Sequence, residues 1–348
     1  MGMLHSAMLN ADGDVRLLAA EQWGPIGNPA AAGVLKRALE DKEPTVRIAA
    51  AGSLYQLGDF SGVKTVEEIV ERSPDAAPSA GGERPRSGDG GPLAAVERMR
   101  VIAKNKVRSI GIRALALMKS PTSLKTLART RKDPDGAVRD ASALALARLG
   151  IGEGLDRFIE ALSDEDPMVR AKAARDLGEV ASPAVTARLK PLAEDPSYPV
   201  RAAVMESLGA SEDVVAIPEL STGMEDQNEL VRSKAVAALG RIPSPSVLPF
   251  LEKALKSPNA TIELLATAGL ARRGQQVDLN LAQRSLSQSD VDTRVLAVEV
   301  PEAVGSERAV EILEFGLEDN EMRVRVRTAA ALVRLLQKKT PKPRGTKP

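Results

Sequence analysis

Residues 164–178 read DEDPMVRAKAARDLG, and this pattern of an acidic turn, a Val-Arg pair, spaced alanines and a Leu-Gly end decides the fold. The central pair returns along the chain as Val15-Arg16, Val46-Arg47, Val107-Arg108, Val138-Arg139, Val169-Arg170, Val200-Arg201 and Val231-Arg232, then as the degenerate copies Ile262-Glu263, Thr293-Arg294 and Val324-Arg325. Successive copies stand 31 residues apart, except for a step of 61 from Val46 to Val107, which is one repeat plus a 30-residue insertion. A fixed period of this size indicates an array of one small supersecondary unit.

Each copy carries the pattern of two antiparallel helices. Before the quoted stretch, an apolar stripe at i, i+3, i+4 and i+7 predicts an amphipathic helix, formed by Leu155, Phe158, Ile159 and Leu162. The acidic turn with Pro167 is typical of the start of a second helix. Residues 1–9 supply the first helix of the first copy, which gives ten copies. We therefore predict an all-α protein, an α-solenoid of about ten antiparallel helix pairs.

The repeat resembles the HEAT-repeat superfamily, and in particular the short variety of about thirty residues that is also found in phycobilisome lyases. The resemblance rests on the acidic turn, the Val-Arg pair, the alanine spacing and the Leu-Gly end, and it covers roughly residues 1–338. It implies a curved array in which the helices that carry the Val-Arg pairs line the concave side.

The repeat pattern predicts a single solenoid domain over residues 1–340, interrupted once. Residues 73–92 read SPDAAPSAGGERPRSGDGGP, of which twelve are Gly, Pro or Ser, so we expect a flexible insertion there. After it, the second helix of the third repeat either begins early and runs unusually long or breaks near residues 104–106. Residues 341–348 form a basic tail that we expect to be disordered.

Residue composition excludes several kinds of chemistry. The chain has no cysteine, which rules out disulfides, thiolate metal sites and a cysteine nucleophile. His5 is its one histidine, so neither a histidine metal triad nor a Ser-His-Asp triad can be assembled. The several His-Glu pairs with which HEAT-type hydroxylases hold iron are excluded in the same way. We therefore expect no catalytic residues, no metal and no cofactor.

The same features bear on where the protein acts. We expect a cytoplasmic location, because the absence of cysteine fits a reducing cytoplasm, although it fits the periplasm equally if a signal peptide has been removed. Residues 1–10 do not read as a signal peptide. No stretch approaches the roughly 18 apolar residues of a membrane-spanning helix, so we expect no membrane insertion.

The net charge of +1 conceals an asymmetry. From Met322 onward there are nine basic residues and no acidic one, which leaves 39 basic against 47 acidic residues, a net of −8, in the first 321. Aromatic residues make up only 2% of the chain. A mildly acidic array with few stacking side chains argues against nucleic-acid binding, except through the basic tail.

The arginines of the repeats divide into two groups. We expect a structural ladder in which each guanidinium meets a carboxylate of its own or the next turn, formed by Arg16, Arg47, Arg108, Arg139, Arg170, Arg201, Arg232 and Arg325. Departures from the pattern in the eighth and ninth repeats suggest a hinge or a partner groove around residues 262–301, although repeat drift explains them too. Together with a sparser arginine row, they give as candidate partner-binding residues Arg148, Arg241, Glu263, Leu264, Arg272 and Arg294.

Three functions are compatible with this pattern. The first is a non-enzymatic scaffold or adaptor that binds a protein partner along the concave face. The second, implied by the resemblance, is a bilin lyase or isomerase that acts on a tetrapyrrole-carrying partner. The third is nucleic-acid binding through a basic surface. We favour the scaffold, because the repeats offer an extended surface and no convergent reactive cluster.

Overall fold

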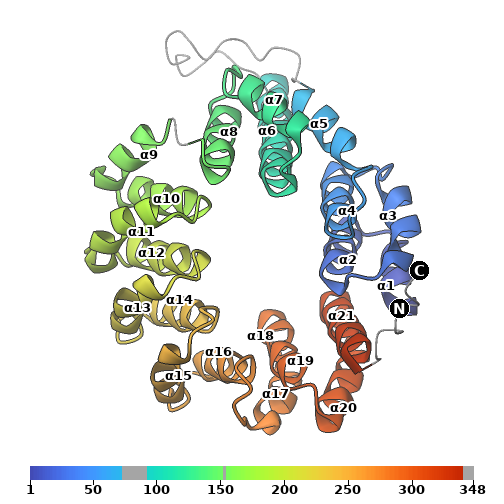
Figure 1. Cartoon of the computed structure of the whole chain (residues 1–348), viewed down its shortest axis with the longest axis vertical. Helices are drawn as coiled ribbons and strands as arrows, with labels where there is room; N and C mark the ends of the chain where they lie inside the picture. The colour runs from blue at the N-terminus through green and yellow to red at the C-terminus, as the bar shows by residue number, and fades with distance from the viewer. Residues whose placement is uncertain (73–91, 152–153, 340–348) are drawn as a thin grey trace, which may run out of the picture. The chain divides into compact units, whose positions relative to one another are not determined.

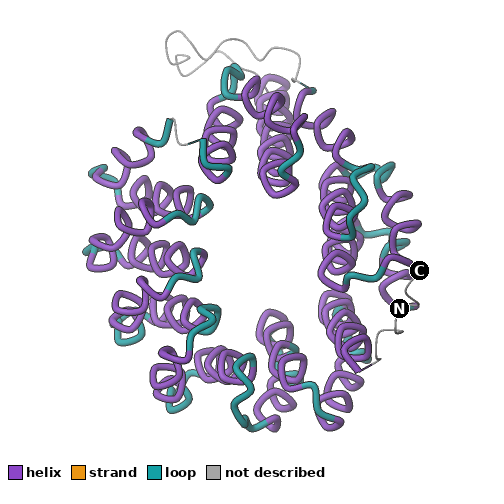
Figure 2. The backbone as a smooth tube through the Cα atoms, in the orientation of Figure 1, coloured by secondary structure: helices purple, strands orange, loops and turns teal. Residues whose placement is uncertain are grey.

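The computed structural model describes residues 1–72, 92–151 and 154–339, which fold into helices joined by short turns (Figure 1, Figure 2). This confirms the all-α prediction, since no strand occurs among the described residues. The chain divides into two compact units, which we call the N-terminal unit (residues 8–155) and the C-terminal unit (residues 1–7 and 156–348). The predicted insertion lies outside the described residues apart from Pro92, and the predicted tail lies wholly outside them. None of the described helices is both long and apolar enough to cross a membrane.

In the N-terminal unit, first and second helices of the repeats alternate along the chain. Its helices are α2 (Gly13–Ile26), η1 (Pro29–Ala31), α3 (Ala32–Ala38), α4 (Pro44–Gln56), α5 (Val63–Glu71), α6 (Pro92–Met118), α7 (Pro121–Thr130) and α8 (Gly136–Arg148). The second helices α2, α4, α6 and α8 stack on one another, and each first helix packs on the second helix of its own repeat. This is the hairpin stacking that the 31-residue period predicts.

The C-terminal unit continues the same arrangement. Its helices are α1 (Gly2–Ala7), α9 (Asp156–Glu160), η2 (Ala161–Ser163), α10 (Pro167–Gly178), α11 (Pro183–Leu189), η3 (Lys190–Glu194), α12 (Tyr198–Ala210), η4 (Val214–Ala216), α13 (Ile217–Gly223), α14 (Glu229–Leu239), η5 (Pro245–Val247), α15 (Leu248–Ala254), α16 (Ala260–Ala271), α17 (Leu279–Ser285), α18 (Val291–Ala297), α19 (Glu299–Val304), α20 (Glu307–Gly316) and α21 (Met322–Lys339). The second helices α10, α12, α14 and α16 stack in order.

The second helices share one starting register, and α6 departs from it. The others begin two residues before the repeated Val position, as α4 does at Pro44 ahead of Val46. By that register α6 would begin at Asn105, but it begins thirteen residues earlier, at Pro92, and runs unbroken to Met118. Of the two alternatives open from the sequence, the early and long helix is the correct one. At 1.5 Å per residue, the extension adds about 20 Å of helix.

The second helix of the ninth repeat is broken by Pro301. A proline has no N–H to donate to the carbonyl four residues earlier, which here belongs to Ala297. The first segment, α18, ends at Ala297, and α19 carries the chain on from Glu299. The second helix of this repeat therefore consists of two short helices.

The first helix of the chain belongs to the C-terminal unit. Helix α1 packs against α21, the last helix, and the side chains of Leu4 and Ala7 are fully buried there. The sequence pattern assigns residues 1–9 to the first repeat, yet the apolar face of α1 is buried in a unit that otherwise begins at residue 156.

The glycine of the Leu-Gly ending permits neighbouring second helices to approach closely. At Gly209 in α12, an added Cβ would lie 2.4 Å from the Cβ and 2.9 Å from the Cα of Ala238 in α14. Real Cβ atoms do not approach that closely, so a side chain at this position would push two helices apart. Gly52, in the interior of α4, has open space around its missing Cβ.

These two glycines give opposite predictions. Replacing Gly209 with Val is expected to lower the free energy of unfolding by about 1–3 kcal/mol through overpacking against α14. Replacing Gly52 with Ala is expected to raise it by about 1 kcal/mol, because alanine favours a helix interior where nothing obstructs it. Thermal denaturation of both variants measures the two effects. A Gly209→Val protein that melts at or above the parent temperature would contradict the close packing described.

Candidate binding site at a break in the arginine ladder

Within a repeat, the arginine of the Val-Arg pair ties its helix to the turn before it. Its Nη1 donates to the backbone carbonyls six and five residues earlier, as Arg170 does to Asp164 at 2.7 Å and Glu165 at 3.1 Å. The arginines with this pair of bonds are Arg16, Arg47, Arg139, Arg170, Arg201, Arg232, Arg294 and Arg325. One guanidinium nitrogen thereby satisfies two turn carbonyls that lack a helical partner.

Between repeats, four of these eight arginines reach an aspartate 25 residues later, in the next acidic turn. The Nε and Nη2 of Arg16 donate to the two carboxylate oxygens of Asp41 at 2.7 and 2.9 Å. The same fork joins Arg170 to Asp195, Arg201 to Asp226 and Arg294 to Asp319, with distances between 2.6 and 3.1 Å. Arg108 holds Asp133 through its two Nη atoms. We call this series the arginine ladder.

Four of the ladder aspartates, Asp41, Asp195, Asp226 and Asp319, have a lowered pKa. The hydrogen bonds from Arg16 and Arg201 keep the pKa of Asp41 and of Asp226 below the ordinary value of 3.8. At Asp195 and Asp319, burial acts to raise the pKa, but the hydrogen bonds from Arg170 and Arg294 and from backbone amides outweigh it, and the pKa is again lowered. Two-pronged charge-assisted hydrogen bonds of this kind are stronger than neutral ones.

This geometry predicts how stability depends on pH. A carboxyl group whose pKa is lower in the folded than in the unfolded state stabilises the fold above its unfolded pKa, near 3.8 here, and this stabilisation is lost as the pH falls through the folded value. The thermal midpoint should therefore be steady near neutral pH and fall steeply below about pH 4. The Asp226→Asn variant should show a shallower fall. Identical acid slopes in parent and variant would contradict the assignment of this stabilisation to the Arg201–Asp226 pair.

The ladder is broken at Arg47. Its Nη1 keeps the usual turn carbonyls, those of Asp41 at 2.5 Å and Lys42 at 3.3 Å. The position 25 residues later, where the other repeats place an aspartate, is occupied by Arg72. Among the described residues no acceptor meets the Nε or Nη2 of Arg47. A second cation thus stands where the carboxylate is expected. At Arg232 the equivalent position is the neutral Ser257.

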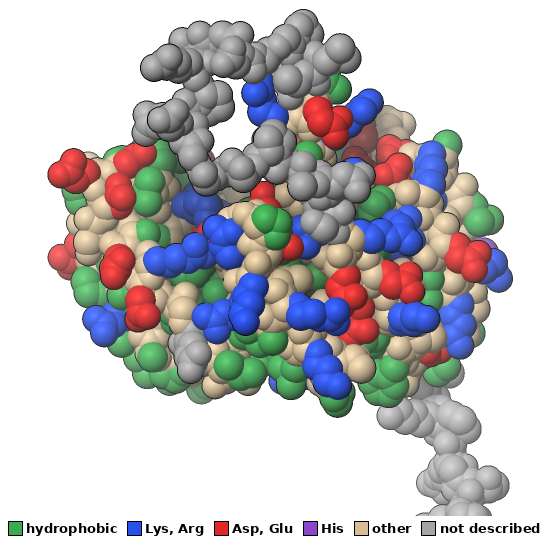
Figure 3. Space-filling view, turned by 90° about the horizontal axis from the view of Figure 1, so that it is seen from above, with side chains coloured by type: hydrophobic (Ala, Val, Ile, Leu, Met, Phe, Trp, Pro, Cys, Tyr) green, Lys and Arg blue, Asp and Glu red, His purple; other side chains and the backbone are tan. Residues whose placement is uncertain are grey.

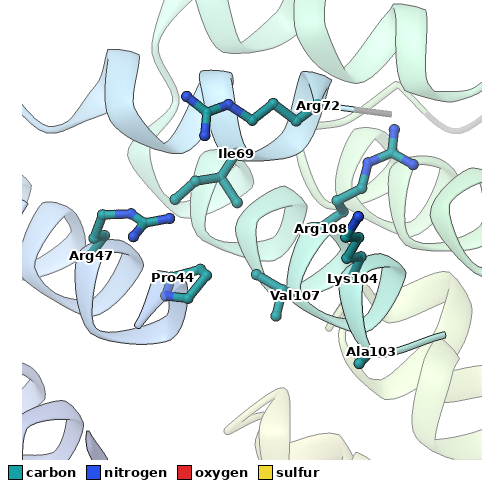
Figure 4. Close-up of a pocket in the computed structure, with 8 residues that line it drawn as sticks. All are labelled: Pro44, Arg47, Ile69, Arg72, Ala103, Lys104, Val107 and Arg108. Atoms are coloured by element: carbon teal, nitrogen blue, oxygen red, sulfur yellow. The ribbon is translucent and has the colours of Figure 1, made fainter. Parts of the chain in front are cut away.

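A pocket of about 560 Å³ opens at this break, between α4, α5 and α6 of the N-terminal unit. In the view of Figure 4, the side chain of Arg47 lies beside Pro44, and the side chain of Arg72 lies on the other side of Ile69. The lining residues are Pro44, Arg47, Ile69, Arg72, Ala103, Lys104, Val107 and Arg108. It therefore has four cationic side chains, no acidic one, and an apolar floor.

The insertion in the third repeat explains why the pocket forms. The turn before the second helix is replaced by the continuous α6, so the carbonyls that the other arginines use are bonded within the helix. Arg108 instead donates from Nε to the carbonyl of Val70 at 2.8 Å, and its guanidinium is buried. With the turn, the acidic residue that pairs with the arginine of the preceding repeat is also absent. Arg72 stands at its position.

The early part of α6 adds an apolar stripe beside the pocket. Val107 and Ala103 line the pocket, and Met99 and Val96 continue the same helical face toward the start of α6. Met99 is 62% exposed and Val96 is 42% exposed. Large apolar side chains in a row on an exposed helix are typical of a surface that contacts a partner.

Two of the candidate residues from the sequence are corrected by the structure. Leu264 has no exposed surface and lies in the core of the C-terminal unit beside Ala268 and Val298, so a partner cannot touch it. Arg294 bonds to Asp319 in the same way as the ladder arginines, with its side chain 11% exposed, and belongs with them. Glu263 remains half-buried on α16.

The other candidates lie at helix ends. Arg148 is exposed at the end of α8 in the N-terminal unit. In the C-terminal unit, Arg241 and Arg272 line a shallow pocket of about 420 Å³ together with Arg273. Arg272 forms an ion pair with Glu299, and Arg273 donates to the carbonyl of Gly269 at 2.6 Å. This second basic pocket is thus already supplied with internal acceptors.

Our reasoning from the sequence counted Arg47 as structural and missed Arg72. The signal was present, because reading 25 residues on from each Val-Arg arginine gives an aspartate in most repeats and an arginine only after Arg47. Figure 3 shows a face on which acidic side chains (red) lie among basic ones (blue) and scattered hydrophobic ones (green). A surface that coats nucleic acid clusters its cations instead. Within the described ranges, no three acidic or histidine side chains are grouped to hold a metal ion.

Comparison with protein families identifies the repeat. The model of the HEAT repeats matches residues 3–79, 155–228 and 217–299. The chain belongs to the HEAT-repeat family. Its helix pairs are therefore the repeats of a HEAT α-solenoid. The match is to HEAT repeats in general and does not single out the phycobilisome-lyase variety.

Three solved structures are similar to the chain at low identity. YibA of Escherichia coli is 19% identical, with 65% of this chain and 86% of that chain covered and a TM-score of 0.37. An engineered protein is 15% identical, covers 96% and 98%, and has a TM-score of 0.34. Human deoxyhypusine hydroxylase, solved with glycerol, is 20% identical, covers 77% and 94%, and has a TM-score of 0.32. No curated protein matches the chain.

Proposed function

We propose that this protein is a non-enzymatic scaffold that binds a protein partner on the surface formed by its second helices. HEAT repeats supply an extended surface on which contacts with a partner are spread over several repeats. The family resemblance assigns this surface to the concave side of the solenoid. The proposal is that a few central anchors dominate the affinity, as at other protein interfaces.

The observation that carries the proposal is the break in the ladder at Arg47. Four other arginines donate from Nε and Nη2 to an internal carboxylate, whereas Arg47 and Arg72 both line a pocket with an apolar floor. Cations that lie close together repel one another, and a bound acidic group relieves that repulsion. The pocket is therefore the place where we expect the partner to be anchored.

Weaker contacts are proposed at the remaining candidate residues. Arg241 and Arg272 stand at the rim of the second basic pocket, and Arg148 and Glu263 are accessible at least in part. The hypothesis of a groove around residues 262–301 is kept as part of this proposal. These positions contribute at the edge of the interface, where single charges have small effects on affinity.

Site-specific photo-crosslinking tests the proposal. A benzophenone amino acid at Lys104, in the pocket, should capture a protein that the same group at Lys125, exposed on α7, does not. The captured protein, once purified, should bind the intact chain in solution. Turnover of a bilin, or the absence of any protein that binds the intact chain, would count against a scaffold. A gel shift with nucleic acid that survives removal of residues 341–348 would favour the third function.

A further inference from the structure

We propose that the pocket at Arg47 and Arg72 binds an aspartate or glutamate side chain of the partner, within a segment whose neighbouring apolar residues lie along α6. This inference rests on the proposed function and specifies the chemistry of the partner. The occupant is an acidic and apolar peptide segment of a second protein.

The ladder itself shows what Arg47 is shaped to hold. In four other repeats, an arginine at the same register, with Nη1 on the same turn carbonyls, presents Nε and Nη2 to the two oxygens of one carboxylate. The Nη1 bonds of Arg47 are in place, so its fork has the same anchoring and lacks the carboxylate. A partner's carboxylate completes this geometry without a change in the arginine.

The neighbouring cations select for negative charge. Arg72 and Lys104 are exposed at the rim, and they line the same space as Arg47. Arg108 is committed to Asp133 and to Val70, so it contributes its field rather than a bond. Three cations around one site favour a carboxylate over an amide of the same shape by their combined charge.

The floor and the α6 stripe determine what flanks the carboxylate. Pro44, Ile69 and Val107 form an apolar floor, which favours a short apolar neighbour on the bound segment. Met99 and Val96 extend this surface along the early part of α6, before the position at which a second helix usually begins. Both side chains are exposed there. A volume of about 560 Å³ lies within the range of pockets that enclose a compact ligand. It accommodates a side chain with its neighbours, not a folded domain.

Restoring the ladder gives the sharpest variant. Arg72→Asp places a carboxylate at the register position that Arg47 lacks, so the two should pair as Arg16 and Asp41 do. The expected result is a raised thermal midpoint together with loss of peptide binding. Arg72→Glu is a second variant with the same charge. Lys125→Glu, exposed on α7 and outside the pocket, makes the same change in net charge and is the control.

The probe is a nonapeptide library displayed on phage, selected on the full chain and counter-selected on the Arg72→Asp protein. Selected sequences should pair Asp or Glu with Leu, Ile, Val or Met. The leading peptide, labelled with fluorescein, should bind the Arg72 variants at least about tenfold more weakly than it binds the parent protein. A peptide in which Asn or Gln replaces the acidic residue, the amide twin, should bind the parent protein more weakly by a similar factor. The Lys125→Glu protein should bind within about twofold of the parent.

Several outcomes would overturn the inference. One is that the parent protein binds the acidic peptide and its amide twin with equal affinity. Another is that the Arg72 variants bind the peptide as tightly as the parent does. A third is that inorganic phosphate displaces the peptide at concentrations where acetate has no effect. A gain in affinity when Asp75, Glu83 and Asp89 are neutralised together would assign the pocket to the chain's own carboxylates instead. If the crosslinked partner binds normally to the Arg72→Asp protein, the scaffold function stands and this inference fails.

Discussion

Replacing Asp133 with Ala is expected to lower the free energy of unfolding of the N-terminal unit by about 3–5 kcal/mol. Asp133 and Arg108 are the most buried ladder pair, with side chains 7% and 4% exposed. Removing the carboxylate leaves the guanidinium of Arg108 buried without its counter-charge, which costs more than the pair itself contributes. The aspartate also accepts a hydrogen bond from the amide of Asp135 at 3.0 Å, so the turn before α8 loses an acceptor.

The matched control is an exposed ion pair. Asp292 and Arg323 are joined at 3.2 Å, but their side chains are 80% and 57% exposed. Asp292→Ala should therefore change stability by no more than about 1 kcal/mol. Urea denaturation, with hydrogen exchange to locate the loss at α6 and α8, measures both variants. Equal effects for the two substitutions would show that burial does not distinguish the ladder from ordinary surface pairs.

Replacing Leu4 with Ala is expected to destabilise the C-terminal unit by about 2–5 kcal/mol. Leu4 is fully buried in α1, and α1 packs on α21. The truncation leaves a cavity and exposes the apolar face of the last helix, which no later repeat covers among the described residues. Hydrogen exchange should accelerate in α21, more than 300 residues away in sequence.

Leu9 supplies the comparison for this variant. It lies five residues further along and is 72% exposed. Leu9→Ala should leave the stability within about 0.5 kcal/mol of the parent. If Leu4→Ala accelerates exchange only in α2 and leaves α21 unaffected, residues 1–7 act as the first helix of the first repeat in the ordinary way. The assignment of α1 to the C-terminal unit would then be wrong.

The sequence pattern was sufficient for most of the fold. The period of 31 gives the hairpins, and the Val position gives the buried face of the second helix in most repeats, although Val169 is 37% exposed. These features depend only on contacts within a repeat or with the next repeat. They therefore recur with the repeat and can be read from the sequence. The contact of α1 with α21 is not local, and nothing in residues 1–9 specifies which helix they cover.

The candidate site was only partly predictable. The repeat identified the arginines, but judging each one by its own repeat assigned Arg47 to the structural group and Arg294 to the binding group. Their roles depend on the residue 25 positions later, which is Arg72 in one case and Asp319 in the other. Leu264 looked accessible because it departs from the pattern, yet the departure fills the core.

The arginine side-chain NMR spectrum tests the central claim most directly, because Nε–H signals report the bonds in question one by one. The Nε protons of Arg16, Arg170, Arg201 and Arg294, which donate to aspartates, should exchange slowly with water. That of Arg47 should exchange rapidly and become protected when the selected acidic peptide is added. An Nε proton of Arg47 that is as protected as the others in the free protein would contradict a break in the ladder, and with it the pocket as a binding site.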